Sequence, residues 1–184
     1  MKRILISAFI YLISNLALGV TSFSLPWMND SSSGTVYRSA DRPSSIFLLE
    51  GWFNGCPYCH ENAPNVDRMA EYFANEDRVQ VLDIGRDSGD SSYSSWVQKH
   101  QPNHPVLKDA RQELIRQLGI SGYPSAFIVD PEGTIRYRTT GVWSYSTQQE
   151  MKNLISQLLE EFEDEVQINP IFEPGPTHFQ YCAF

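Results

Sequence analysis

The sequence predicts an α/β domain in which helices flank a central mixed β-sheet. The apolar runs 46–53 and 79–84 are nearly continuous, which is typical of strands buried on both faces. Apolar residues recur at helical spacing between these runs, and the order strand, helix, strand predicts a parallel crossover unit. Two further strand-like segments, 125–129 and 134–138, flank the turn-forming residues 130–133 and predict an antiparallel hairpin.

The segment between the crossover unit and the hairpin carries weaker signals. Residues 87–95 are polar and predict a loop, which we expect to lead into a short helix over 96–99 and a small strand over 105–107. Asp109 is a suitable N-terminal cap for a helix over 110–118. An additional helix and strand are therefore expected before the hairpin.

The last predicted helix has the clearest pattern. Thr147 and Glu150 have the spacing of a capping box at its start. One face is apolar, formed by Met151, Leu154, Ile155, Leu158, Leu159 and Phe162. The acidic run 160–165 stands at the unfavourable end of the helix dipole, so we expect the helix to fray there.

The chain divides into four parts. Its 184 residues suit one globular domain of ordinary size. We expect a signal peptide over 1–22, an N-terminal extension over 23–44, the compact domain over 45–163 and an irregular tail over 164–184.

The N-terminus has the pattern of a secretory signal peptide. Lys2 and Arg3 precede the apolar run 4–18, which is shorter than the roughly 20 residues that span a bilayer. Small residues provide candidate cleavage sites after Gly19 and after Ser22, and a retained membrane anchor is the alternative. The protein is therefore expected to be exported, which means periplasmic in a Gram-negative bacterium.

The charge of the chain argues against a nucleic-acid partner. Its formal net charge is −8, and removal of Lys2 and Arg3 with a signal peptide lowers it by two, to −10. Such a protein offers little to neutralise phosphates.

Two of the three cysteines, Cys56 and Cys59, have a spacing that suits a redox pair at the start of a helix. Helix N-terminal amides favour an anion and so stabilise the first sulfur as a thiolate, the form that attacks disulfides. Pro57 suits the first helical turn. We therefore expect Cys56 to be the exposed attacking thiol and Cys59 the resolving one.

Other uses of these side chains remain open. Structural zinc needs four ligands, and neither a second cysteine pair nor a histidine pair completes such a set, although His100, His104 and His178 are present. His60 is either a solvated residue or one that tunes the thiolate. Cys182 is a free or packed thiol, or else a partner for another cysteine.

The chain from about Ser45 to Phe162 resembles the thioredoxin superfamily, and within it the exported TlpA and ResA-like branch. The resemblance rests on the strand ending in Trp52-Phe53, the Cys56-Pro-Tyr-Cys59 run, Pro64, and Gly122-Tyr-Pro-Ser125. It implies a thioredoxin-like fold, with the segment from Asp87 to Leu107 as the strand and helix insertion of the TlpA branch.

The resemblance also implies a client-binding site around the cysteines. In that family the proline in the last of these motifs is cis, and the loop around it offers backbone groups to a client chain. The resemblance therefore implies a cis bond before Pro124 and a client-binding role for Tyr123 and Pro124. The side chains of Trp52, Pro57 and Tyr58 are the other expected client contacts.

Glu50 stands six residues before Cys56, where thioredoxins carry a buried acid that moves the proton of the resolving thiol. Burial would raise its pKa and suit it to act as a base toward Cys59. The alternative is an edge-strand glutamate that points at water. Gly55, Asn62 and Tyr123 depart from the pattern of the branch and leave the redox direction open.

The sequence thus predicts an exported protein thiol-disulfide oxidoreductase, most simply a reductase, with no cofactor beyond the Cys56–Cys59 disulfide. Its expected partners are client proteins with cysteines or disulfides and a separate redox partner protein. Contact with a membrane is expected only if the signal segment is retained. The competing hypothesis is a non-catalytic copper or zinc carrier, or a redox-sensing adaptor, that uses the same cysteines.

Overall fold

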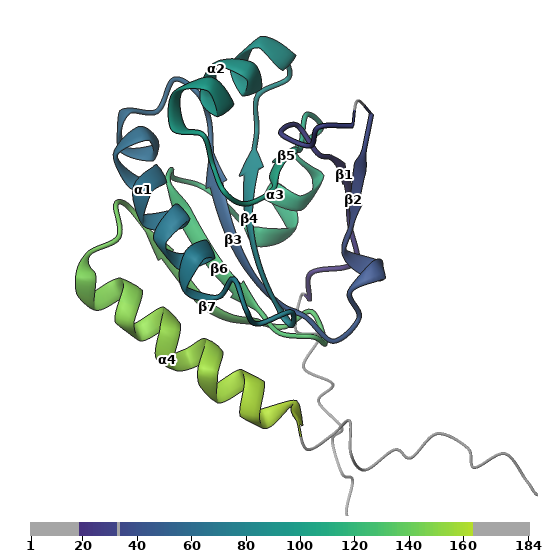
Figure 1. Ribbon diagram of the computed structural model, residues 1–184, viewed down its shortest axis with the longest axis vertical. Coiled ribbons are helices and arrows are strands. Elements are labelled where there is room, and N and C mark those ends of the chain that lie inside the picture. Colours follow the sequence, from purple (N-terminus) through teal and green to yellow (C-terminus); the bar gives the residue numbers. More distant parts are fainter. Residues whose placement is uncertain (1–18, 33, 164–184) are drawn as a thin grey trace, which may run out of the picture.

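A five-stranded mixed sheet forms the centre of the computed structural model, which describes residues 19–32 and 34–163 (Figure 1). Its strand order is β5-β4-β3-β6-β7. The three strands β3, β4 and β5 are parallel, whereas β6 and β7 run antiparallel to their neighbours. The bounds of these strands are Ile46–Trp52 for β3, Val79–Gly85 for β4, Val106–Lys108 for β5, Ser125–Val129 for β6 and Ile135–Thr140 for β7.

Helices α1 (Pro57–Tyr72) and α4 (Tyr145–Glu161) cover one face of the sheet (Figure 1). Helix α3 (Glu113–Leu118) covers the other face together with a hairpin of β1 (Ser24–Pro26) and β2 (Val36–Arg38) (Figure 1). Helix α2 (Asp90–His100) lies beyond the carboxyl ends of the parallel strands, near the start of α1 (Figure 1). This end of the sheet is therefore enclosed by two helices and several loops.

The expected thioredoxin-like α/β fold is confirmed, and the elements follow the predicted order. The parallel crossover through α1 and the antiparallel hairpin of β6 and β7 are both present. The segment expected as an insertion contains α2 and β5. Central strand β3 is completely buried, which explains its continuous apolar sequence.

The segment 23–44, expected as an extension, contributes residues to the core. Phe23 and Tyr37 are buried in the same hydrophobic cluster as Phe47. The preceding residues are also held, because the backbone N–H of Val20 donates to the Gly133 carbonyl over 2.7 Å. The β1–β2 hairpin thus covers the part of this sheet face that α3 does not cover.

The polar loop predicted over 87–95 is wrong, because α2 already begins at Asp90. Two aromatic residues one turn apart, Tyr93 and Trp96, are buried and anchor this otherwise polar helix. The sequence does not predict this part of the helix, because the residues around Tyr93 and Trp96 are mostly serines and show no apolar residues at helical spacing.

Two helix starts also differ from the prediction. Helix α3 begins at Glu113 rather than at residue 110, yet Asp109 does cap it: the two carboxylate oxygens accept the backbone N–H groups of Glu113 and Ile115 over 2.9 Å. Helix α4 begins at Tyr145.

The capping residue of α4 is Ser144, whose hydroxyl accepts the Thr147 N–H over 3.1 Å. The predicted capping box of Thr147 and Glu150 is therefore wrong, and Glu150 instead accepts the Tyr137 hydroxyl over 3.2 Å. The expected apolar face of α4 is correct, with Met151, Ile155 and Leu158 fully buried.

Most of the predicted signal peptide and the predicted tail, with His178 and Cys182, lie outside the described residues. Among the described residues, no helix is both long and apolar enough to cross a membrane.

Candidate active site

Cys56 and Cys59 lie where β3 ends and α1 begins, and they form a disulfide with an S–S distance of 2.18 Å. Cys56 is the N-cap of α1, and its sulfur accepts the backbone N–H of Cys59 over 3.0 Å. Pro57 occupies the first helical turn, as expected. A sulfur in this position is stabilised as a thiolate by the amide that it already contacts and by the helix dipole.

The expectation of an exposed Cys56 is wrong in this disulfide state. Cys56 is 3% exposed and Cys59 is completely buried. Met28, Phe53, Val97 and Tyr123 pack against the hydrophobic cluster that holds both cysteines. The neighbouring Pro57 and Tyr58 are exposed, so the expected client contacts at these two positions are accessible.

The Tyr123–Pro124 peptide bond is cis, as predicted, and leads directly into β6. Tyr123 is half-buried, and its ring packs edge-on against Phe53 with 5.3 Å between centroids. The guanidinium of Arg86 lies 5.1 Å from the Phe53 ring and 5.3 Å from the Tyr123 ring. The predicted client loop therefore stands beside the cluster of the cysteines, and a cation lies over the rings of Tyr123 and Phe53.

Gly51 allows this loop to approach the sheet closely. A Cβ atom at this position in β3 would lie only 2.6 Å from Cδ1 of Ile120 and 3.6 Å from the Tyr123 ring. The absence of a side chain at Gly51 thus lets the segment before Pro124 pack directly on the strand that leads to the cysteines.

Trp52 does not fit its expected role as a client contact, because it is completely buried. Its ring stacks on Trp96 with 3.9 Å between centroids and meets Tyr93 edge-on at 5.4 Å. Trp52 instead packs α2 against the end of β3 below the cysteines. The aromatic character of the position reflects this packing.

Glu50 is buried, with 1% exposure, on central strand β3, so the alternative of an edge-strand glutamate facing water is wrong. Desolvation raises the pKa of this carboxyl well above its usual range, and the charge of Asp83 raises it further. The side-chain amide of Asn62, three residues after Cys59, donates to Glu50 Oε1 over 3.4 Å. A buried acid with a raised pKa is therefore in place beneath α1.

Asp83 and His104 were not identified as site residues from the sequence. Asp83 is the register partner of Glu50 on β4 and is 1% exposed, and His104 Nε2 lies 3.3 Å from its Oδ2. The second ring nitrogen of His104, Nδ1, lies 3.2 Å from Asp67 Oδ1. The only feature of the sequence that pointed to them is that Asp83 interrupts the apolar run 79–84.

His60 is half-buried and hydrogen-bonded at both ring nitrogens, which excludes the interpretation of a freely solvated residue. Nε2 lies 2.8 Å from the Asn54 carbonyl and Nδ1 lies 2.7 Å from His100 Nε2. Since a carbonyl only accepts, Nε2 carries the proton and Nδ1 accepts from His100. An influence of His60 on the thiolate remains a prediction.

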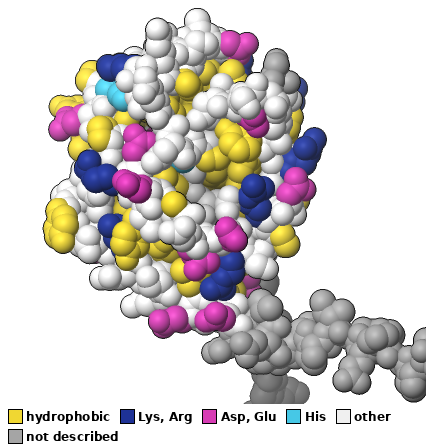
Figure 2. Space-filling view, in the orientation of Figure 1, with side chains coloured by type: hydrophobic (Ala, Val, Ile, Leu, Met, Phe, Trp, Pro, Cys, Tyr) yellow, Lys and Arg dark blue, Asp and Glu magenta, His cyan; other side chains and the backbone are white. Residues whose placement is uncertain are grey.

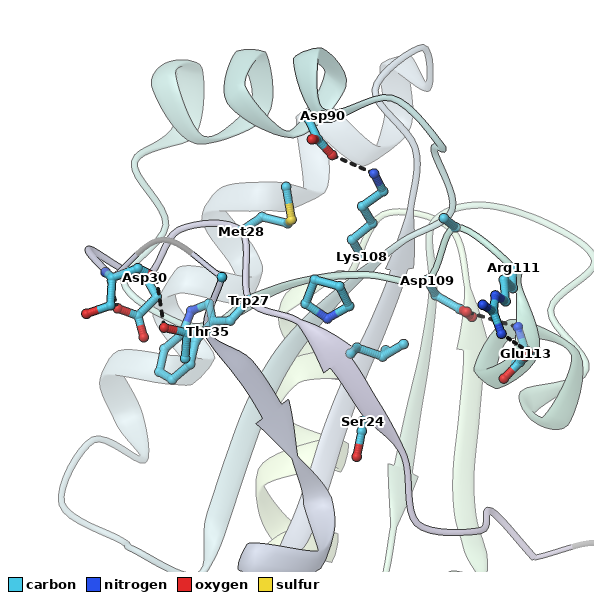
Figure 3. Close-up of a pocket in the computed structure, with 15 residues that line it drawn as sticks. Ser24, Trp27, Met28, Asp30, Thr35, Asp90, Lys108, Asp109, Arg111 and Glu113 are labelled. Atoms are coloured by element: carbon cyan, nitrogen blue, oxygen red, sulfur yellow. Dashed lines mark hydrogen bonds and ion pairs between the residues drawn. The ribbon is translucent and has the colours of Figure 1, made fainter.

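The cavity in Figure 3, about 750 Å³ in volume, lies between the β1–β2 hairpin and the start of α3 and does not include the cysteines. Four of its charged side chains form two ion pairs, Lys108 with Asp90 and Arg111 with Glu113 (Figure 3). On the face shown in Figure 2, basic side chains are dispersed among acidic and apolar ones. Within the described part of the chain, no three His, Cys, Asp or Glu residues are grouped to hold a metal ion, so the metal-carrier hypothesis gains no support.

Comparison with known proteins finds relatives that are named for thiol-disulfide chemistry. The chain is 30% identical over 112 residues to the "Probable thiol:disulfide interchange protein DsbE-2" of Pasteurella multocida, with 60% of this chain and 56% of the relative covered. It is 20% identical over 126 residues to the thiol-disulfide oxidoreductase ResA of Bacillus subtilis, with 68% of this chain and 70% of the relative covered. The match thus spans little more than half the length of the first of these relatives.

A solved thiol-disulfide oxidoreductase from Bacteroides fragilis has the same fold, with a TM-score of 0.63 and 19% identity over 74% of this chain and 98% of that one. The resemblance to ResA-like proteins seen in the sequence motifs is therefore confirmed. The model of the AhpC/TSA family matches residues 19–138. With a thioredoxin-like fold, a disulfide at the start of α1 and this match over more than half of its length, the chain belongs to the AhpC/TSA family.

Proposed function

We propose that the protein is an exported thiol-disulfide oxidoreductase that exchanges disulfides in client proteins. The observation that carries this proposal is the Cys56–Cys59 disulfide at the N-terminus of α1, beside the cis Tyr123–Pro124 bond. The names of the DsbE and ResA relatives support the same activity. The disulfide itself is the redox group, and the proposed chemistry requires no other cofactor.

In the reducing direction the reaction consists of two exchanges. The Cys56 thiolate attacks a client disulfide, which forms a mixed disulfide and releases the first client sulfur as a thiolate. Cys59 then gives its proton to Glu50 and attacks the Cys56 sulfur, which forms the Cys56–Cys59 disulfide and releases the second client thiolate. Two electrons pass to the client, and a separate dithiol protein restores the reduced pair.

The geometry supports a division of roles between the residues. Pro57 and Tyr58 are exposed next to Cys56, and Tyr123 and Pro124 form the adjacent loop, so these four residues would bind the client chain. Glu50 lies beneath α1 and is connected through Asn62 to the helix that carries Cys59. We assign proton transfer to Glu50 because its raised pKa suits a base for a thiol.

Export is proposed from the N-terminal sequence. The charged residues Lys2 and Arg3 and the apolar run 4–18 have the pattern of a signal peptide. Periplasmic residence, with a membrane anchor if the segment is retained, follows for a Gram-negative host. The mass of the protein purified from the cell envelope distinguishes the cleaved from the anchored form.

Turnover of a disulfide substrate tests the function. The full mature chain should catalyse reduction of insulin by dithiothreitol, and the variant Cys56→Ser should abolish this catalysis. Cys182→Ser is the matched control and should retain it, because the reaction uses only the pair on α1. Undiminished catalysis by Cys56→Ser would refute the proposal.

The redox direction is decided by the reduction potential of the Cys56–Cys59 couple. A potential of about −270 mV is that of a thioredoxin-like reductant and about −120 mV that of a strong oxidant, a difference of about 7 kcal/mol for two electrons. Equilibration with glutathione measures it. We expect a value on the reducing side, as the ResA resemblance implies.

A further inference from the structure

Two buried carboxyl groups lie side by side beneath α1. Glu50 on β3 and Asp83 on β4 are register partners, so both side chains point to the same face of the sheet, and each residue is 1% exposed. Within the described structure, Glu50 Oε2 and Asp83 Oδ1 have no hydrogen-bond partner. Two adjacent buried carboxylates cannot both be charged at neutral pH without a compensating cation.

That cation is His104, which stands just before β5. Its side chain is 3% exposed and lies between two carboxylates, with Nε2 3.3 Å from Asp83 Oδ2 and Nδ1 3.2 Å from Asp67 Oδ1. Burial alone would lower the pKa of His104, but Asp83 and Asp67 outweigh it and raise the pKa to about 9. Trp96 Nε1 also donates to Asp83 Oδ2 over 3.2 Å, which holds this carboxylate in place.

We propose that Asp83 and His104 are positioning residues that set the pH at which Glu50 exchanges a proton with Cys59. The inference rests on the function proposed above, and neither residue needs to touch the client. The negative charge of Asp83 makes ionisation of Glu50 harder, whereas the positive charge of His104 makes it easier. The two residues therefore act on Glu50 with opposite signs.

Few other charged or titratable side chains lie near Glu50, Asp83 and His104. Helix α1 contributes Asp67 and His60, and α2 contributes His100, which hydrogen-bonds to His60. On the opposite side, β6 places Ala126 beside Glu50 and adds no charge. Asp83 is thus the nearest carboxylate and His104 the buried cation that is paired with it.

Titration of the carboxyl groups in the oxidised full chain tests the proposal without turnover. Carbon-13 NMR of labelled Glu and Asp side chains follows the resonance of Glu50, which Glu50→Gln assigns by its loss. Asp83→Asn should lower the titration midpoint of Glu50 by about one unit or more. His104→Gln should raise the pH at which the Glu50–Asp83 pair releases its shared proton.

The matched control is Asp130→Asn, which removes another buried carboxylate, just after β6, one that pairs with Arg136. It should leave the Glu50 midpoint unchanged. Shifts of opposite sign in Asp83→Asn and His104→Gln support the proposal. Unchanged midpoints, or shifts in the same direction, overturn it.

A variant that removes both charges guards against misfolding, because His104→Gln alone leaves Asp83 buried without a cation. The double variant Asp83→Asn, His104→Gln should titrate at a higher pH than Asp83→Asn alone. The midpoint of kcat/KM against pH should move in step with the NMR midpoint in each folded variant. A turnover midpoint that stays fixed while the NMR midpoint moves overturns the link to Cys59, whereas absence of turnover in the unaltered protein contradicts only the proposed function.

Discussion

Asn62 connects the buried Glu50 to the loop that precedes α4. Its side-chain nitrogen donates to Glu50 Oε1 over 3.4 Å, and its oxygen accepts the backbone N–H of Trp143 over 2.8 Å. Asn62 is completely buried and follows Cys59 by three positions. One amide therefore stabilises both the acid below the cysteines and the packing of the last helix.

Removal of this amide should weaken the fold. We expect Asn62→Ala to lower the free energy of unfolding by about 1–3 kcal/mol, because the Trp143 N–H is left buried without an acceptor. The pKa of Glu50 should rise further, since the lost hydrogen bond lowers it. Urea denaturation measures the first effect, and Asn75→Ala, at an exposed position, should change stability by no more than about 0.5 kcal/mol.

The ion pairs of His104 should make stability depend on pH. The folded-state pKa of about 9 exceeds the unfolded value of about 6.5, so the stabilisation is complete below pH 6.5 and is lost as the pH rises to 9. The shift corresponds to about 3 kcal/mol. In denaturation of the oxidised protein, the difference between the natural chain and His104→Gln should shrink over this interval; a difference that grows with pH would contradict the assigned charge.

A side chain at Gly51 should disturb the loop around Pro124. In Gly51→Ala the new Cβ would lie 2.6 Å from Ile120 Cδ1, so Ile120 must move. We expect a loss of about 1–3 kcal/mol in stability and a lower kcat/KM for disulfide exchange, because Tyr123 follows Ile120 in the loop. Gly89→Ala is the control for an added Cβ without a clash, since the nearest neighbour of that Cβ would be Ser91 Oγ at 3.7 Å. Gly89 is the N-cap of α2, so this change affects stability through the cap but should leave kcat/KM unchanged. An equal loss of kcat/KM in the two variants would refute the argument.

The start of α4 can be tested by changing its cap. Ser144→Ala should cost about 1 kcal/mol, because the hydroxyl that accepts the Thr147 N–H is lost. Glu150→Gln should cost less than about 0.5 kcal/mol, because Glu150 does not cap the helix. Thermal or urea unfolding compares the two, and a larger cost for Glu150→Gln would favour a cap at Thr147.

Local sequence patterns were sufficient for the main sheet and the cysteine pair. The apolar runs of β3 and β4 and the position of Cys56 before a helix depend on neighbours in the chain. The choice of Pro124 for the cis bond followed from the family resemblance. The buried position of Glu50 followed from a resemblance, because an acid in an apolar strand has no local partner that reveals its surroundings.

The features that were missed depend on contacts between distant segments. Asp83 and His104 are 21 positions apart and meet only because β4 and β5 are neighbours in the sheet. Trp52 was expected to contact the client, but α2 covers it through Trp96. Both Ser144 and Thr147 are good caps by residue type, so the residue types alone do not distinguish them, and in the structure Ser144 is the cap.

The hydrogen bond from Val20 to Gly133 bears on where the proposed signal peptide would be cleaved. Thr21 adds a second contact at this point, with its N–H donating to the Gln117 side chain over 3.0 Å. Cleavage after Gly19 leaves a new N-terminus that retains both contacts, whereas cleavage after Ser22 discards them and starts the chain at the buried Phe23. If the proposed signal peptide is removed, the choice between the bonds after Gly19 and after Ser22 thus decides whether residues 20–22 stay in the folded domain.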